Sequence, residues 1–338
     1  MRIILTGFGA VGQNLAKILR DENERFVHSY GFKPSIVAVS DSRGHCVDEN
    51  GLDLDRLLKT KAEHGTVAKY PGKGEKGQAD MSLIDETEAE VLVEVTSSNF
   101  HDGEPGLSNI KTALASGKHV VTTNKGPLAL AMPALLELAE HKDLRFRFSG
   151  TVGAGTPFLD FASKCLARDS ITGVRGILNG TTNYILTRME AGSVTLKKAL
   201  SEAPAKGYAE ADPTNDLEGL DTAAKVVIVA NWVLKRRLSL KDLEIKGMDK
   251  VSSEWLRKAK KNSKKVKLIG KIDQSQASVK LEEVPFSDPV CVPGIMNALS
   301  YSTLHSGQVT LIGPGAGGEQ TASAVIRDLI DVRGEYTE

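Results

Sequence analysis

Apolar residues in the first part of the chain follow two different spacings. Short β-rich runs alternate with segments whose apolar residues recur at helical spacing. The runs lie at 2–6, 35–40, 89–98, 119–124 and 144–150. Strands that alternate with helices need crossover connections, which make the strands parallel and cover both faces of the sheet. Residues 1–150 therefore predict an α/β domain on a parallel sheet.

The spacing changes after residue 150. Helical periodicity dominates, with one strand near 173–179 and helices near 156–168, 183–191, 195–206 and 218–234. The runs VKLIGKID and ASVKLEEV alternate and are separated by QSQ, which predicts antiparallel strands. A strand, a glycine turn and a helix then follow at 308–338, as in the first domain. We therefore predict a first domain over 1–150 and 308–338, split by an inserted α+β domain over 151–307.

Composition and charge limit the class of protein. Hydrophobic residues make up 41% of the chain and its formal net charge is zero, so no overall charge attracts nucleic acid or an anionic membrane. No signal peptide precedes the first strand, and no apolar run is long enough to span a bilayer. Cys46, Cys165 and Cys291 show neither disulfide nor zinc spacing, which suits a reducing compartment. We expect a cytoplasmic protein.

One basic run stands out against this balance of charge. The segment RKAKKNSKKVK at 257–267 carries seven positive charges. Nucleic-acid surfaces usually interleave such charges with aromatic residues, and this run has none. The pattern instead predicts a solvated helix face followed by a loop.

A glycine motif lies where the first strand is predicted to meet the first helix. The segment RIILTGFGAVG fits G-x-G-x-x-G. Its first glycine permits a tight turn, the second lets the backbone approach a pyrophosphate, and the third lets helix and strand pack closely. Backbone N–H groups at the helix N-terminus then bind phosphate. The motif predicts a Rossmann-type dinucleotide site at Gly7, Phe8, Gly9, Ala10, Val11 and Gly12.

The end of the second strand bears on which dinucleotide binds. An acidic residue at this point binds the ribose hydroxyls of NAD, whereas a nearby arginine accommodates the 2′-phosphate of NADP. The segment SDSRG offers both, as Asp41 and Arg43, and Lys59 or Lys61 is positioned to add a second cation. We expect NADP as the cofactor, with NAD also accepted.

Polar residues follow two further strands of the predicted sheet. Thr96 and Ser97 end one strand, and Lys125 follows TTN at the end of the next. Such residues often only cap helices. In an open parallel sheet, however, ligands bind at the carboxyl ends of the strands. Two such clusters at one edge therefore indicate the nicotinamide end of the cofactor site.

The segment KGYAEADPTNDLEGLDTAAKVVIVAN, at 206–231, places several carboxylates and one lysine directly before an apolar tract. Asp221 and Lys225 are four residues apart and share one face of a helix. An exposed ion pair is the ordinary explanation, but the apolar residues that follow leave little polar face, so the lysine needs a partner. With Glu210 and Asp212 from the preceding loop, the site suits a small zwitterionic substrate.

Longer motifs occur in the order that is found in homoserine dehydrogenases. They are GFGAVG, TTNKGPLA, GTVGAGTP, LNGTTNYIL, KGYAEADPTNDLEGLDTAAK and GPGAGGEQTASAVIRDL. The chain resembles this family over essentially its whole length. The resemblance implies NAD(P)-dependent interconversion of L-homoserine and L-aspartate 4-semialdehyde, a step toward threonine, methionine and isoleucine. It also implies a homodimer whose inserted domain carries catalysis and dimerisation.

The same resemblance implies roles for individual side chains. Lys225 matches the usual candidate for proton transfer, and Lys125 matches an active-site lysine near nicotinamide and substrate. Glu210, Asp221 and Thr181 match residues of the substrate site. These assignments agree with the interpretation of the acidic segment from its residues alone.

Three further features follow from the resemblance. GTVGAG matches a loop whose backbone carbonyls hold a monovalent cation such as sodium, which implicates Val152 and Ala154. Gly317, in the last glycine-rich motif, matches the cofactor site, while Asn215 stands where some relatives carry an acid. Many relatives continue into a threonine-sensing domain; because this chain ends soon after the last motif, we expect no feedback through one.

Three other functions compete with this interpretation. A semialdehyde dehydrogenase that forms a cysteine thioester requires an activated cysteine, and Cys165 lies in a predicted helix without that context. A metal-dependent alcohol dehydrogenase requires closely spaced ligands, but the seven histidines include no close pair. A dinucleotide-sensing regulator would bind the cofactor without turnover and would not need the acid–lysine segment. We therefore expect an oxidoreductase.

Overall fold

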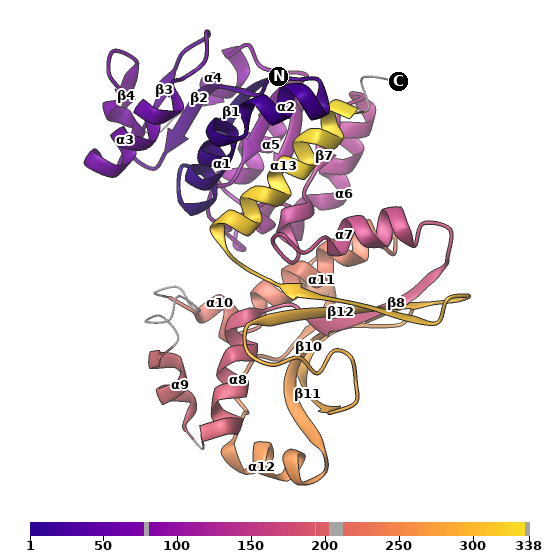
Figure 1. The fold of residues 1–338 in the computed structure, drawn as a ribbon. Coiled ribbons are helices and arrows are strands. Elements are labelled where there is room, and N and C mark those ends of the chain that lie inside the picture. Colours follow the sequence, from indigo (N-terminus) through magenta and orange to yellow (C-terminus); the bar gives the residue numbers. More distant parts are fainter. Residues whose placement is uncertain (78–80, 193, 203–211, 335–338) are drawn as a thin grey trace. The chain divides into compact units, whose positions relative to one another are not determined.

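The computed structural model describes residues 1–338 except 78–80, 193, 203–211 and 335–338. The chain folds into two compact units (Figure 1). The first comprises Met1–Thr151 and Gly317–Glu338, and the second comprises Val152–Ala316. Within the described ranges, no helix combines the length and the apolar character that crossing a bilayer requires.

A seven-stranded sheet forms the centre of the first unit, in the order β4-β3-β2-β1-β5-β6-β7. Five strands are parallel: β1 (Arg2–Thr6), β2 (Ser35–Asp41), β5 (Val91–Glu94), β6 (His119–Thr122) and β7 (Phe146–Arg147). At one end of the sheet, β3 (Gly44–Val47) pairs antiparallel with β2, and the edge strand β4 (Gly74–Lys76) pairs antiparallel with β3. The predicted α/β class with a parallel sheet is therefore confirmed.

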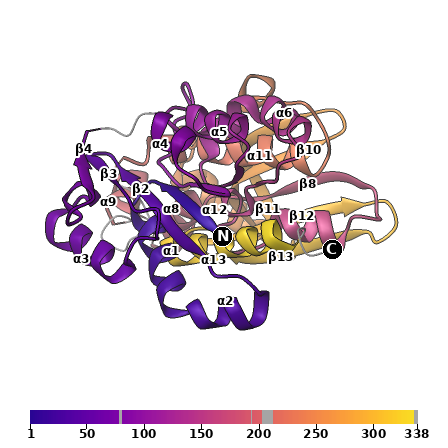
Figure 2. The same cartoon turned by 90° about the horizontal axis from the view of Figure 1, so that it is seen from above.

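Helices cover both faces of this sheet, as the alternation in the sequence predicts. Figure 2 shows α4 (Met81–Glu86), α5 (Gly106–Ala115) and α6 (Lys125–His141) on one side, and α1 (Ala10–Asp21) with α13 (Gly318–Gly334) on the other. The helices α2 (Asn23–Tyr30) and α3 (Leu54–His64) complete the unit. Side chains alternate across a strand, so Ile3 and Leu5 of β1 pack in one cluster with Leu15 and Val325.

The second unit contains a six-stranded sheet in the order β13-β12-β8-β10-β11-β9. Its strands are β8 (Ile171–Ile177), β9 (Glu244–Ile245), β10 (Lys264–Asp273), β11 (Ala277–Pro285), β12 (Met296–Thr303) and β13 (Gln308–Pro314). The predicted antiparallel pair is present as β10 and β11, whose register runs from Lys264 opposite Pro285 to Ile272 opposite Ala277. Strand β12, which the sequence pattern did not reveal, pairs with both β8 and β13.

Helical segments accompany this sheet. They are α7 (Phe158–Asp160) with the π-helical turn Phe161–Cys165, α8 (Gly180–Gly192), α9 (Leu196–Glu202), α10 (Thr214–Leu217), α11 (Leu220–Trp232) and α12 (Ser253–Lys261). In α11 every residue from Asp221 to Asn231 is buried, because the helix packs against β10, β11 and α10. A helix that is buried all round must give each polar side chain an internal partner.

The chain returns to the first unit later than we expected. Residues 308–314 form β13, which pairs along its whole length with β12 of the second sheet, from Met296 opposite Pro314 to Ser302 opposite Gln308. Only the segment from Gly317 onward, with α13, belongs to the first unit. The sequence pattern of a strand, a glycine turn and a helix fits either unit. A local pattern does not specify which other strand the new strand pairs with.

The basic run also differs from its prediction at one position. The helix α12 and the start of β10 carry most of it at the surface, but Lys267 is 1% exposed. Its Nζ atom donates to Asn183 Oδ1 (2.6 Å), the Val292 carbonyl (2.9 Å) and Thr187 Oγ1 (3.4 Å). All three acceptors are uncharged, and burial lowers the pKa of Lys267 to about 8.

Replacing Lys267 should change how the free energy of unfolding depends on pH. The pKa of this amine falls from 10.5 in an exposed lysine to about 8 in the folded chain. Between these values the unfolded chain binds a proton that the folded chain does not, so its contribution to stability rises with pH. Over that pH range, the free energy of unfolding of the original protein should rise by about 2–3 kcal/mol relative to that of Lys267→Met. Urea titrations at each pH measure this difference.

A matched control is available on the same strand. Lys264 has a side chain that is 41% exposed and lies near Glu283, so Lys264→Met shows what the loss of a surface lysine alone does to the profile. Parallel pH profiles for the original protein and Lys267→Met would contradict the titration of Lys267.

Candidate functional site

The glycine turn joins β1 to α1 in the first unit. Gly7 has a φ of +97°, and a Cβ atom there would lie 2.7 Å from the backbone of Val95. A Cβ atom on Gly12 would lie 2.3 Å from the Gly7 carbonyl oxygen, so this glycine allows the helix to approach the strand. A Cβ atom on Gly9 would meet nothing within 4 Å. The first and third glycines therefore serve packing, and the second leaves the turn open.

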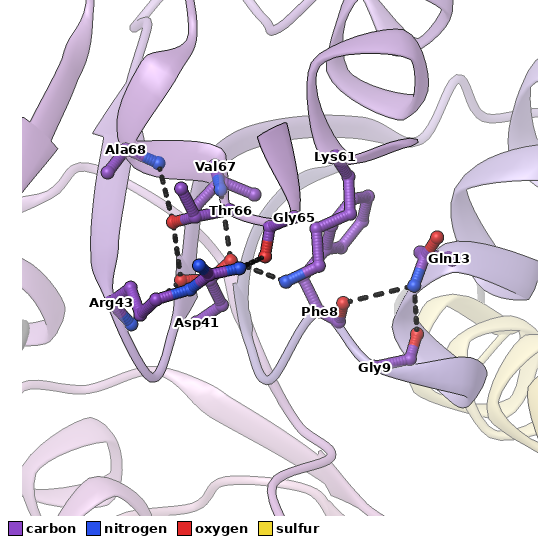
Figure 3. Close-up of polar contacts among 10 residues, drawn as sticks. All are labelled: Phe8, Gly9, Gln13, Asp41, Arg43, Lys61, Gly65, Thr66, Val67 and Ala68. Atoms are coloured by element: carbon purple, nitrogen blue, oxygen red, sulfur yellow. Dashed lines mark hydrogen bonds and ion pairs between the residues drawn. The ribbon is translucent and has the colours of Figure 1, made fainter. Parts of the chain in front are cut away.

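The open position lies at the N-terminus of α1. Gly9 is the N-cap residue of this helix and provides no side-chain cap. Gln13 shapes the turn by donating from Nε2 to the carbonyls of Phe8 (3.3 Å) and Gly9 (3.2 Å) (Figure 3). The N–H groups that begin a helix attract anions, because they combine unused donors with the positive end of the helix dipole. The geometry of the turn thus fits a phosphate-binding site.

Gly317 lies beside this turn within the same unit. It has a φ of +125° and directly precedes α13. A Cβ atom on its neighbour Gly318 would lie 3.2 Å from Ala10 and 2.9 Å from Asn14. The first residues of α13 and of α1 are therefore in close contact, although they are about 300 positions apart in the sequence.

Asp41, at the end of β2, has both carboxylate oxygens occupied (Figure 3). Oδ1 accepts from the Arg43 N–H (2.9 Å) and from Thr66 Oγ1 (3.0 Å). Oδ2 accepts from Lys61 Nζ (2.6 Å) and from the Val67 N–H (2.9 Å). A carboxylate has about four lone-pair positions, so these donors use all of them. Burial raises the pKa of Asp41, but the four donors together outweigh it and leave that pKa below its usual value.

Two cationic side chains lie near Asp41, and of the two lysines that we considered only Lys61 reaches it. Lys61 extends from α3 to Asp41, whereas Lys59 has a 73% exposed side chain and lies near Glu63 on its own helix. Residues two positions apart do not share a helix face, so only one of the two lysines reaches the strand end. The guanidinium of Arg43 donates to the Gly65 carbonyl at the C-terminus of α3.

The polar residues after β5 and β6 lie together at the carboxyl edge of the sheet. The Lys125 N–H donates to Ser98 Oγ (3.0 Å), and Asn124 Nδ2 donates to Thr96 Oγ1 (3.0 Å) and to the Ser97 carbonyl (3.4 Å). Asn124 also caps α6, because its Oδ1 accepts from the Gly126 N–H at 3.0 Å. The structure thus shows Asn124 as a cap that also brings the two clusters together, and their place at the nicotinamide end stays a prediction.

In the second unit, Lys225 forms the ion pair that the spacing predicts. Its Nζ atom lies 2.6 Å from Asp221 Oδ2 and 2.7 Å from the Leu178 carbonyl. The side chains are 8% and 13% exposed respectively, so the pair is largely removed from water. A buried pair of this kind is strongly destabilised when one partner is removed.

Two further residues complete this cluster, and we did not single them out as site residues from the sequence. Asn179 donates from Nδ2 to Asp216 Oδ1 (2.7 Å) and to Asp221 Oδ2 (2.9 Å). Burial, and then the nearby Asp221 carboxylate, raise the pKa of Asp216, while a hydrogen bond from Thr181 opposes that shift. The motifs LNGTTNYIL and KGYAEADPTNDLEGLDTAAK contain both residues, but neither motif shows which side chains point inward.

Of the remaining predicted acids, Asp212 is described by the structure. Asp212 is exposed, and its Oδ1 accepts from the Thr214 N–H (3.1 Å) and Oγ1 (2.6 Å), which lowers the pKa of Asp212. Asn215, next to Asp216, is also exposed. Glu210 lies outside the described residues.

In the loop of Val152 and Ala154, the backbone of Ala154 is left-handed, with a φ of +51°, which is uncommon for a residue other than glycine. Cation binding there stays a prediction.

The cysteines do not supply an activated nucleophile. Burial raises the pKa of Cys46 to about 12 and also raises that of Cys291. Cys165 is exposed in the π-helical turn after α7. Because the thiolate is the reactive form, the structure offers no support for a cysteine thioester at Cys46 or Cys291.

Comparison with known proteins assigns this arrangement to a family. The family model for homoserine dehydrogenase matches residues 157–330, and that for glutamate/leucine/phenylalanine/valine dehydrogenase matches residues 1–99. A homoserine dehydrogenase of Methanocaldococcus jannaschii is 42% identical over 98% of both chains. The chain belongs to the homoserine dehydrogenase family. The resemblance that the motifs indicate is therefore confirmed.

Two other homoserine dehydrogenases are described with different cofactors. An NAD⁺-dependent homoserine dehydrogenase of Pseudomonas canavaninivorans is 39% identical, covering 99% of this chain and 97% of its own. The structure of a hyperthermophilic archaeal homoserine dehydrogenase in complex with NADPH is 29% identical, with a TM-score of 0.86, and covers 99% of this chain and 98% of its own. The Rossmann-type fold of the first unit agrees with these homoserine dehydrogenases.

Alanine at two of the three glycines should separate folding from dinucleotide binding. In Gly12→Ala, the 2.3 Å approach to the Gly7 carbonyl would force α1 away from β1, and the free energy of unfolding should fall by about 1–3 kcal/mol. In Gly9→Ala the new methyl group meets no protein atom within 4 Å. Its stability should be retained while dinucleotide affinity falls about tenfold, because the methyl lies where the phosphate approaches.

Urea unfolding gives the stability of both variants, and fluorescence titration with a reduced dinucleotide gives their affinities. Equal losses of stability in Gly9→Ala and Gly12→Ala would contradict the separate functions of the two glycines.

Proposed function

We propose that the protein catalyses the NAD(P)-dependent interconversion of L-homoserine and L-aspartate 4-semialdehyde. The observation that carries this proposal is the cluster of the buried residues Lys225, Asp221 and Asn179 with the half-buried Asp216, which lies within residues matched by the homoserine dehydrogenase family model. The cluster joins an amine to carboxylates in a site largely closed to water. A substrate with an ammonium group and a hydroxyl group fits both kinds of side chain.

In the proposed mechanism, Lys225 acts on the side-chain oxygen of the substrate. Oxidation breaks the O–H and C–H bonds of the alcohol, and the proton leaves through this amine. NAD(P) would supply the hydride acceptor for oxidation of the alcohol carbon and the hydride donor for the reverse reaction. During reduction the protonated form of Lys225 stabilises the negative charge that develops on the aldehyde oxygen and donates a proton to it. Since oxidation releases a proton, alkaline solution favours that direction.

The other members of the cluster hold this amine in place. Asp221 lies 2.6 Å from Lys225 Nζ, and Asn179 donates to the same carboxylate. Asp216 is anchored by the same asparagine, and we propose that it binds the substrate ammonium together with Glu210. Thr181 affects the pKa of Asp216 through a hydrogen bond, which supports its proposed place at the substrate.

We infer that NADP is the preferred cofactor and that NAD is accepted. Asp41 has no lone pair left for a ribose hydroxyl, because four protein donors surround it. Arg43 and Lys61 place two cations at the same strand end, which suits a 2′-phosphate. The family includes members named with either cofactor.

Several expectations from the sequence are retained in this proposal. Lys125 serves the nicotinamide end of the cofactor site, with Thr96 and Ser97 beside it. The loop of Val152 and Ala154 binds a monovalent cation such as sodium through its carbonyls. The active form is a homodimer, and the protein works in the cytoplasm. The three cysteines are free, which suits a reducing compartment.

The first test is the absorbance of reduced nicotinamide after L-homoserine is mixed with NADP or NAD at alkaline pH. Turnover with either cofactor supports the enzyme. Binding of the dinucleotide without turnover would instead favour a dinucleotide-sensing regulator and would overturn the proposed function.

Lys225→Ala should abolish most turnover while leaving dinucleotide affinity unchanged. The loss of a proton-transfer group lowers kcat by about 10²–10⁴-fold, whereas the fingerprint of the cofactor site lies in the first unit. Removing the amine also leaves Asp221 without its cationic partner, so the variant's folding must be checked by circular dichroism. Unchanged kcat in folded Lys225→Ala would show that another group transfers the proton.

Arg43→Ala and Lys61→Ala should weaken NADP more than NAD. Loss of a charge-assisted contact to the 2′-phosphate should raise the KM for NADP about 10–100-fold and change the KM for NAD little. Lys59→Ala is the comparison on the same helix, and it should alter neither KM because this lysine lies away from Asp41. A larger effect in Lys59→Ala than in Lys61→Ala would reverse this assignment.

A further inference from the structure

Glu94 is a completely buried carboxylate at the centre of the first sheet. It ends β5, is 0% exposed, and pairs in register with Thr6 at the end of β1 and Thr122 at the end of β6. No lysine, arginine or histidine among the described residues forms an ion pair with it. A buried carboxylate without a cation is costly unless hydrogen bonds replace its lost water.

Four side chains and one backbone N–H supply those hydrogen bonds. Oε2 accepts from Thr6 Oγ1 and from Asn109 Nδ2, both at 2.6 Å. Oε1 accepts from the Thr96 N–H at 2.9 Å, from the Thr96 hydroxyl, and from Asn124 Nδ2 at 3.4 Å. These hydrogen bonds replace the water that the Glu94 carboxyl group loses on burial.

Three of these donor residues lie in segments at the carboxyl edge of the sheet, and the fourth, Asn109, lies on α5. Thr6 directly precedes Gly7 of the glycine turn, and Thr96 lies in the loop that follows β5. Asn124 is the N-cap residue of α6 and directly precedes Lys125. The Glu94 backbone carbonyl also accepts from Thr122 Oγ1 (2.8 Å) and from the Thr123 N–H (3.1 Å). One residue thus connects all three segments.

We propose that Glu94 is a positioning residue for the dinucleotide site. Its carboxylate holds the Gly7 turn, the Thr96 loop and the N-terminus of α6 in the arrangement that receives the nicotinamide end of the cofactor. This inference rests on the proposed function, because it assumes that the edge of the sheet binds a dinucleotide. Glu94 itself needs no contact with the cofactor or the substrate.

An amide at this position should be a poor substitute for the carboxylate. The N–H of Thr96 can only donate, and the orientation of Asn124 is set because its Oδ1 accepts from the Gly126 N–H. Oε1 must therefore remain an oxygen. The NH₂ of Glu94→Gln would have to replace Oε2, facing the Nδ2 of Asn109 at the distance of a hydrogen bond. The loops would then lose both a charge and one favourable contact.

The test compares Glu94→Gln with Glu90→Gln. Glu90 lies just before β5, at the opposite edge of the sheet, where it accepts from the Arg2 N–H. Dissociation constants for NADP and NADPH, the KM for each substrate, kcat and the thermal midpoint are measured for both variants. In Glu94→Gln we expect the dissociation constants to rise about tenfold or more, with the KM for homoserine within about twofold. Glu90→Gln should keep the original values.

A purely structural role would give a different result. It would lower the thermal midpoint and the fraction of active protein, but the folded fraction would bind the dinucleotide with unchanged affinity. Unchanged dissociation constants in Glu94→Gln, with or without a lower midpoint, would overturn the proposal.

Asn109→Ala provides a second route if Glu94→Gln does not fold. Asn109 lies on α5 and donates from Nδ2 to Glu94. Any change in dinucleotide affinity in this variant therefore acts through the Glu94 carboxylate. We expect about threefold weaker binding, and unchanged binding would overturn the proposal. If the original protein binds NADP without oxidising homoserine, the proposed function fails while these affinities still test Glu94. If it binds no dinucleotide, both proposals fail.

Discussion

The ion pair of Lys225 and Asp221 is the interaction on which the second unit's site depends. Helix α11 is buried from Asp221 to Asn231, and an ammonium group in such a helix is stable only with close oxygen partners. Asp221 supplies one at 2.6 Å and the Leu178 carbonyl another at 2.7 Å. The same contacts that make burial possible also hold the amine in one position, and a fixed amine is what proton transfer to a substrate oxygen requires.

A second buried lysine in this unit shows what the carboxylate contributes. Lys267 donates to three uncharged oxygens, and burial lowers its pKa to about 8. It connects α8 with the segment before β12 through Asn183 and Val292. Lys225 has a carboxylate within hydrogen-bond distance, and that carboxylate is held in turn by Asn179. Lys267 thus forms a cross-link through neutral partners, whereas Lys225 forms an ion pair that belongs to a larger polar cluster.

Two carboxylates in the first unit accept hydrogen bonds from neighbouring loops and so hold those loops in position. Asp41 and Glu94 each end a parallel strand, and protein donors surround both. Their negative charges hold N–H and O–H groups of neighbouring loops in place. In the proposed cofactor site, Arg43 and the N-terminus of α1 attract phosphate beside Lys61, which pairs with Asp41. Where an acid lies in a nucleotide fold therefore does not by itself identify a ribose-binding residue.

The sequence by itself determined the fold class, the glycine turn and the Asp221–Lys225 pair, because each depends on residues close together in the chain. Alternating strands and helices imply a parallel sheet, and a four-residue spacing implies a shared helix face. Only the tertiary structure decided that β13 pairs with β12, that Lys61 rather than Lys59 reaches Asp41, and that Asn179 joins Asp216 to Asp221. These outcomes depend on which distant segments meet, and local spacing carries no information about that.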